Sequence, residues 1–173
     1  ETATAAINAA LTGHLVLRTL HTNDSLRVVS RLISTVVEPY LLGDALAMSQ
    51  AQRIFKKLSS YCKRGVPVSN EIQDLFHRNG IIYDQINEHI YEADGFEECG
   101  GSGFLGGVAI MEMCPVNEQI SKMISCRSSM CDMRKEAAKQ QVLSLNQEGM
   151  KQVILGNTTL KQISKLSHFG AMQ

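Results

Sequence analysis

Long hydrophobic runs are missing from this 173-residue chain, and so is an excess of charge of either sign. A helix needs roughly 20 apolar residues to cross a bilayer, so neither a membrane span nor a signal peptide is predicted within these residues. The 17 basic residues balance the 17 acidic ones. That balance gives no electrostatic case for nucleic acid or an anionic membrane as a main partner.

Cysteines are few and odd in number. The five of them are scattered, whereas a secreted disulfide framework favours an even and denser set. The pattern indicates a reducing compartment, and therefore the cytoplasm. The chain also opens at Glu1, without methionine, directly in a helix-like segment. We therefore expect it to be a piece of a longer protein.

The first part of the chain predicts three helices and one strand. Alanine-rich residues 1–12 end at a glycine, which suits a helix and its C-cap. Residues 14–20, HLVLRTL, have the length and the β-branched and leucine content of a buried strand. Apolar residues then repeat at helical spacing over 26–36, and Pro39 suits the first turn of a helix through about Ala51.

The later elements are mixed. Expected in chain order are a strand over 52–58, a loop over 59–70, a short helix stopped by Gly80, an ambiguous helix or strand within 81–94, and a strand VAIMEMC over 108–114. From 117 onward the pattern predicts three or four short helices. Two of them have capping-box spacing, Ser144 with Gln147 and Thr159 with Gln162.

The strand expected at 14–20 poses a problem, because one strand between helices cannot form a sheet alone. Its parallel neighbours should come from sequence outside these 173 residues. In their absence its edge and apolar faces need cover. We therefore predict self-association of this chain, or a rearranged N-terminal region.

Two histidines, His14 and His21, lie at the two ends of this expected strand. Parallel α/β folds place ligands at the carboxyl ends of strands, which puts His21, Thr22 and Asn23 where a phosphate or metal would lie. A histidine N–H and a threonine hydroxyl can both donate to a γ-phosphate oxygen. The plainer alternative is that either histidine is a hydrogen-bonded core or strand-end residue.

The segment that contains the two histidines resembles a motif of a known family. TGHLVLRTLHTND, residues 12–24, looks like the histidine box of the type II secretion and type IV pilus assembly ATPases. Several motifs in the family's order within one chain are stronger evidence for the family than any one motif. The others are ETA at 1–3, EPYLL at 38–42, Gln52-Arg53 before a basic strand, and a tail from Met133-Arg134 through Gly149-Met150 to GNTTL at 156–160.

The resemblance implies the C-terminal portion of a RecA-like P-loop ATPase domain, α/β to α+β and helix-rich, with a truncated sheet. The family implies a hexameric cytoplasmic motor, peripheral to the inner membrane, that uses ATP and Mg and couples to secretion or pilus platform proteins. His14 and His21 would then lie near the nucleotide, beside Thr22 and Asn23. Arg53 could reach a neighbouring subunit or the nucleotide, although a solvated strand face is the plainer alternative.

The resemblance also divides the chain into three parts. Residues 1–58 would end the ATPase core, 59–114 would replace the family's tetracysteine zinc region with a hairpin and insertion, and 115–173 would form a C-terminal helical subdomain. The phosphate-loop motif G-x-x-x-x-G-K-[ST] is absent from the sequence. We expect ATP hydrolysis by a longer parent and none by these 173 residues alone.

The zinc site of the family has lost half of its ligands here. Ser59 and Phe96 stand where two of the four cysteines would fall, and Cys62 and Cys99 remain. Structural zinc needs four nitrogen or sulfur ligands, so no metal is expected. GSGFLG, 101–106, matches G-x-G-x-x-G but precedes a strand, so it is interpreted as the knuckle of a degenerate zinc hairpin. These losses, with Gly107, favour an alternative function as a non-catalytic assembly or interaction module.

Overall fold

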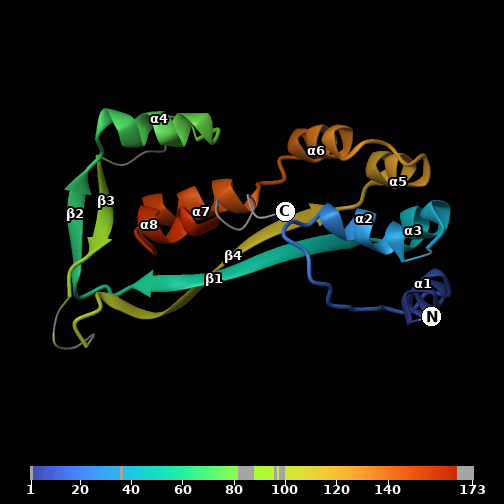
Figure 1. Ribbon diagram of the computed structural model, residues 1–173, viewed down its shortest axis with the longest axis horizontal. Helices are drawn as coiled ribbons and strands as arrows, with labels where there is room; N and C mark the ends of the chain where they lie inside the picture. The colour runs from blue at the N-terminus through green and yellow to red at the C-terminus, as the bar shows by residue number, and fades with distance from the viewer. Residues whose placement is uncertain (1, 36, 82–87, 96, 98–99, 167–173) are drawn as a thin grey trace. The chain divides into compact units, whose positions relative to one another are not determined.

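The computed structural model describes residues 2–35, 37–81, 88–95, 97 and 100–166. The chain forms two compact units. The first joins Glu1–Ala51 with Glu112–Leu143, and the second joins Gln52–Met111 with Ser144–Gln173. Strands β1 (Met48–Leu58) and β4 (Phe104–Pro115) pair with each other, and each runs from one unit into the other (Figure 1). The three-part division by family motifs stays a prediction.

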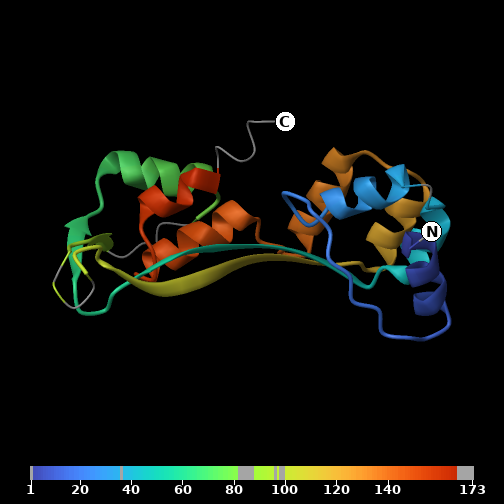
Figure 2. The same cartoon turned by 60° about the horizontal axis from the view of Figure 1, so that its bottom comes forward.

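The first unit packs short helices around one apolar core. Its helices are α1 (Thr2–Leu11), α2 (Arg27–Ser34), α3 (Pro39–Ala45), α5 (Glu118–Ser125) and α6 (Met130–Lys139) (Figure 2). Gly43 lets α3 approach α5 closely, because an added Cβ would lie 2.6 Å from Ser125 Oγ and 2.8 Å from the Ser121 carbonyl oxygen. The buried core of this unit consists of Ile7, Leu26, Val29, Val37, Leu42, Cys114, Ile120, Ile124, Met133 and Ala137.

The second unit combines strands β2 (Lys63–Pro67) and β3 (His89–Ala93) with α4 (Asn70–Arg78), α7 (Leu145–Ile154) and α8 (Leu160–Ile163). The two strands pair antiparallel, with Gly65 opposite Tyr91. The Thr158 hydroxyl, fully buried, donates to the Lys56 carbonyl oxygen at 2.9 Å. This bond ties the turn between α7 and α8 to β1.

The strand expected at 14–20 is wrong for this structure. Residues 14–22 run without regular secondary structure between α1 and α2, and Leu15 and Leu17 are 88% and 84% exposed. The physical reason is that a strand is held by hydrogen bonds to neighbouring strands, and no strand of the described part pairs with this segment. The apolar sequence alone therefore does not make it a strand here.

Several other element boundaries differ from those expected from the sequence. The helix expected from Pro39 to Ala51 ends at Ala45, and β1 begins at Met48, because this stretch pairs with β4. The expected loop at 59–70 contains β2, and β4 begins at Phe104 rather than 108. The ambiguous stretch 81–94 contains β3, while residues 82–87 lie outside the described residues.

The helices that carry local start signals are confirmed. Ser69, Asn117, Ser129, Ser144 and Thr159 each accept a backbone N–H bond at the start of a helix, as N-caps do. At Ser144 both halves of the capping box form with Gln147. The expectation of three or four helices beyond 117 is met by α5 to α8.

Candidate functional site

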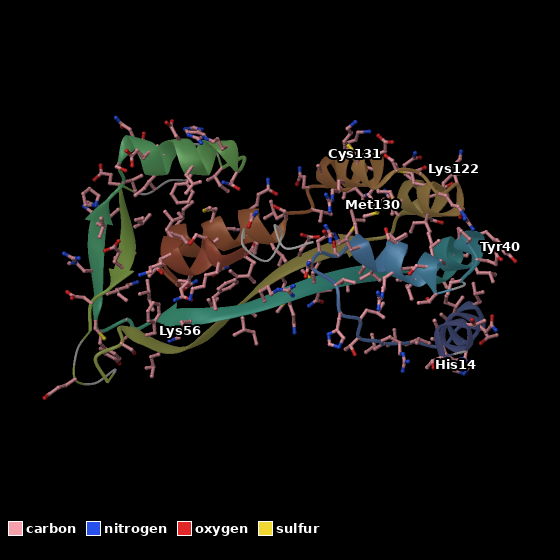
Figure 3. The ribbon with its side chains drawn as sticks, viewed as in Figure 1. His14, Tyr40, Lys56, Lys122, Met130 and Cys131 are labelled. Carbon is pink, nitrogen blue, oxygen red and sulfur yellow. The ribbon has the colours of Figure 1, made fainter. Side chains whose placement is uncertain are left out.

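The candidate site lies on the segment between α1 and α2, which we call the histidine segment (residues 14–23). His14 begins it beside α1 (Figure 3), with its backbone N–H donating to the Ala9 carbonyl at 3.1 Å. Its ring Nδ1 lies 3.2 Å from Thr12 Oγ1. His21 is exposed near the other end, and Thr22 and Asn23 follow half-buried. The structure thus presents both histidines to solvent on one extended stretch.

Arg53 is the remaining candidate residue from the sequence. It lies half-buried on β1, in the second unit, and its Nη1 donates to the Gln52 carbonyl at 2.8 Å. The histidine segment belongs to the first unit. The role proposed for Arg53 at a subunit boundary or nucleotide therefore stays a prediction.

The turn that ends the histidine segment is held by a buried carboxylate. Glu112 of β4 accepts hydrogen bonds from the Ser25 backbone N–H at 2.9 Å and from the Ser25 hydroxyl at 2.5 Å. Ser25 is fully buried, and Glu112 is 9% exposed. A buried carboxylate is costly unless hydrogen bonds replace its water, and these two bonds supply that replacement.

Asp24 holds the same turn from its other side. Its Oδ1 accepts the backbone N–H of Arg27, the first residue of α2, at 2.9 Å. Its Oδ2 lies 3.3 Å from Arg27 Nε and 2.8 Å from Arg134 Nη2 of α6. The turn is therefore joined to β4 through Ser25 and to α6 through Asp24.

Sequence reasoning missed Glu112 as part of this site. A signal was present, because Glu112 is a charged residue at an inward position of an otherwise apolar strand, VAIMEMC. A charge at such a position needs a partner. Its partner lies 87 positions away, and no local pattern could name it.

Glu112 also influences its neighbour Cys114. Burial, first, and the nearby Glu112 charge, second, raise the pKa of the Cys114 thiol above its ordinary value. Thiolates are the reactive form of cysteine. Cys114 is a buried core residue of β4, and its raised pKa favours the thiol over the nucleophilic thiolate.

The remnant of the zinc motif lies partly within the described residues. Cys62 and Ser59 are both buried, while Phe96 and Cys99 lie outside the described residues. Within the part of the chain that the structure describes, no group of three or more histidine, cysteine or acidic side chains could hold a metal ion. No described helix is long and apolar enough to cross a membrane.

Comparison with solved structures shows the class of fold. The pilus retraction motor PilT, solved with bound ADP, superimposes with a TM-score of 0.61 at 19% identity, over 95% of this chain and 36% of that one. The Legionella pneumophila ATPase DotB superimposes with a TM-score of 0.57 at 16% identity, over 98% of this chain and 36% of that one. The chain therefore shares its fold with part of these two proteins.

The sequence comparison assigns the family. The chain belongs to the family described as "Type II/IV secretion system protein", whose model matches residues 1–165. It is 35% identical over 164 residues to the type IV pilus assembly ATPase PilB of Myxococcus xanthus, covering 94% of this chain and 29% of that protein. It is 30% identical to the type II secretion system protein HxcR of Pseudomonas aeruginosa, covering 96% and 31%. The chain thus spans about 30% of these relatives' length, and the expected family is confirmed.

Proposed function

We propose that this chain is the C-terminal part of a hexameric ATPase that powers type II protein secretion or type IV pilus assembly. The observation that carries the proposal is the family match over residues 1–165, together with 35% identity to a type IV pilus assembly ATPase over 94% of the chain. The motor would work in the cytoplasm against platform proteins of the inner membrane. Its phosphate loop and Walker B segment would lie in sequence outside these 173 residues.

The histidine segment would meet the nucleotide in this motor. His21 is exposed, so its ring N–H is available to a γ-phosphate oxygen of ATP, and Thr22 and Asn23 adjoin it with further donors. Donors aimed at the transferred phosphoryl group stabilise the charge that develops there. His14 would lie nearby, and Mg would accompany the ATP. The 173 residues alone would not turn ATP over, because they contain no phosphate-loop motif.

Substitution in the parent protein tests this role. In a protein that carries an intact phosphate loop upstream of this chain, His21→Ala should lower ATP turnover on the order of 100-fold, the typical loss of one charge-stabilising donor. His89→Ala is a matched control, since His89 is exposed on β3. Turnover unchanged by His21→Ala would show that the role assigned to this residue is wrong.

A second candidate function is a non-catalytic assembly module of a secretion system. Ser59, Phe96 and Gly107, at positions where the family resemblance leads us to expect two cysteines and an arginine region, favour it. ATP binding by the parent protein separates the two functions. Magnesium-dependent binding of labelled ATP supports the motor, whereas no binding by the folded parent supports the module.

A further inference from the structure

We propose that a groove between α2, α5 and α6 binds a short segment of another protein, one that carries an apolar side chain beside a carboxylate. The groove lies wholly within the first unit. It would serve a motor or an assembly module alike, so it does not depend on the proposed function. We call it the α2–α6 groove, and its lining includes Val29, Ile33, Ile124, Arg127, Met130 and Met133.

The α2–α6 groove is apolar and continuous with the core of the first unit. Val29, Ile124 and Met133 are buried members of that core, and Ile33 and Met130 pack against it half-buried. The groove has a volume of about 260 Å³. Pockets for drug-sized molecules are larger, roughly 300–1,000 Å³. The groove therefore suits one or two side chains of a peptide better than a whole small molecule.

The charge of the groove is positive. Of the described residues that line it, Arg127 alone is charged, and its side chain is exposed. No acidic side chain in the described part of the chain forms an ion pair with it, whereas Arg27 and Arg134 both approach Asp24. A guanidinium presents paired N–H donors that match a carboxylate. An acidic group beside the apolar side chain is therefore the chemistry that this groove complements.

The backbone at Arg127 gives independent support. Arg127 follows the C-cap of α5 with φ +52°, a left-handed conformation in which glycine is the favoured residue. Its N–H donates to the Ile124 carbonyl at 3.0 Å, and the Ser128 N–H donates to the Met123 carbonyl at 2.9 Å. These bonds end the helix and hold Arg127 in this conformation.

Such strain by itself does not mark a site, because Gln141 has φ +59° in the same position after α6. Arg127 differs from Gln141 in lining an apolar groove. An arginine at this position forgoes the stability that glycine would give, and binding of a carboxylate at the groove supplies a use for its side chain.

Binding of labelled peptides to the 173-residue chain tests the proposal. The probes are short peptides, blocked at both ends, that place a leucine or phenylalanine beside a glutamate. Each has a counterpart with glutamine in place of the glutamate. Fluorescence polarisation should show binding about fivefold tighter for the glutamate probes, as expected for a partly exposed ion pair, and the preference should shrink in about 1 M salt. Equal affinity of the two sets, or no binding tighter than about 1 mM, would overturn the proposal.

Two glycine variants separate the side chain of Arg127 from its backbone. Arg127→Gly should raise the thermal midpoint by about 2–4 °C, because glycine adopts this conformation without strain, and should weaken binding of the glutamate probes about fivefold. Gln141→Gly is the matched control, since it relieves the same conformation away from the groove lining. It should raise the midpoint similarly and change binding by less than about twofold. Unchanged binding by Arg127→Gly would show that Arg127 does not recognise the carboxylate.

Two neighbouring charge insertions locate the bound peptide. Ser34 lines the groove and Thr35 does not. Both are exposed, and both hydroxyls donate to the carbonyl three residues earlier at 2.8 Å. Ser34→Glu should weaken binding of the glutamate probes by at least about fivefold, through repulsion between like charges, and Thr35→Glu should weaken it less. Equal losses would show that the peptide lies outside the groove.

Two further results would assign the groove to a different occupant and overturn the proposal. A dimer of the wild-type chain that Ser34→Glu dissociates, measured by light scattering, would show that a second copy fills the groove. Loss of probe binding in the longer parent protein would show that the parent's own sequence covers it. A monomer that binds the glutamate probes equally well within the parent is the result that we expect.

Discussion

The histidine segment and the helical stretch beyond residue 117 differ in secondary structure although their sequences are similar in kind. Both carry regular apolar patterns. The histidine segment remains without secondary structure, with Leu15 and Leu17 exposed, whereas α5 to α8 form with capped ends and buried apolar faces. A helix satisfies its backbone within itself, but a strand needs another strand. An apolar sequence pattern is therefore enough to predict secondary structure only where the backbone hydrogen-bond partners are close together in the sequence.

The largest expected effect comes from a substitution in the buried core, set against one in the histidine segment. Ile124 of α5 is fully buried, and Ile124→Ala should lower the free energy of unfolding by about 2–5 kcal/mol. Leu17→Ala in the histidine segment should change it by less than about 0.5 kcal/mol, because Leu17 is already in water. Urea unfolding followed by circular dichroism measures both. A large loss for Leu17→Ala that grows with protein concentration would show that another copy of the chain covers this segment.

A smaller effect separates local helix preference from packing. Alanine is a better helix former than glycine by about 1 kcal/mol, so local preference alone predicts that Gly43→Ala stabilises the protein. The structure predicts a loss of about 1–3 kcal/mol instead, because the added Cβ would meet the Ser121 carbonyl on α5.

The matched control for this variant is Gly149→Ala in α7. There the three nearest atoms to the added Cβ are side-chain methyl carbons of Ile163 and Ile110, the closest at 2.9 Å, and none belongs to the backbone. Thermal unfolding should therefore show the larger loss at Gly43. A stabilised Gly43→Ala variant would contradict the close approach of α3 and α5.

The capping box of α7 should contribute a moderate amount. Ser144→Ala removes a cap whose hydroxyl accepts the Gln147 N–H, and the free energy of unfolding should fall by about 1 kcal/mol. Ser60→Ala, at an exposed turn position, is the control and should have little effect. Equal midpoints of urea unfolding for the two variants would show that the cap does not stabilise α7.

The smallest effect is a pH dependence at the start of α6. The hydrogen bond from Ser129, first, and the charge of Lys135 lower the pKa of Asp132 below its ordinary 3.8. A lowered carboxyl pKa gives stability that is complete above pH 3.8 and is lost as the pH falls through the folded-state value. NMR titration of Asp132 should show its midpoint below 3.8, and Ser129→Ala should raise it. A midpoint above 3.8 in the wild type would contradict this account.

Much of the helical structure could be predicted from sequence, because its signals are local. Ser69, Asn117, Ser129, Ser144 and Thr159 all serve as N-caps of helices in regions where periodicity indicated them. The strands were harder to predict from the sequence. Residues 48–51 resembled the end of a helix, and β2 resembled a loop, since what makes them strands is pairing with β4 and β3. Of the candidate site, His14, His21, Thr22 and Asn23 were named from the sequence and their role stays a prediction, whereas the contact of Glu112 with Ser25 was missed because its partners lie 87 positions apart.

The family and the capped helices can be read from the sequence, since ordered motifs and bonds between near neighbours are visible along the chain. The lack of secondary structure over residues 14–22 and the contact of Glu112 with Ser25, 87 positions away, become visible in the folded chain alone. The physical reason is the range of the interactions. A cap bonds within three residues, whereas strand pairing and a buried carboxylate find their partners only when distant parts of the chain are brought together.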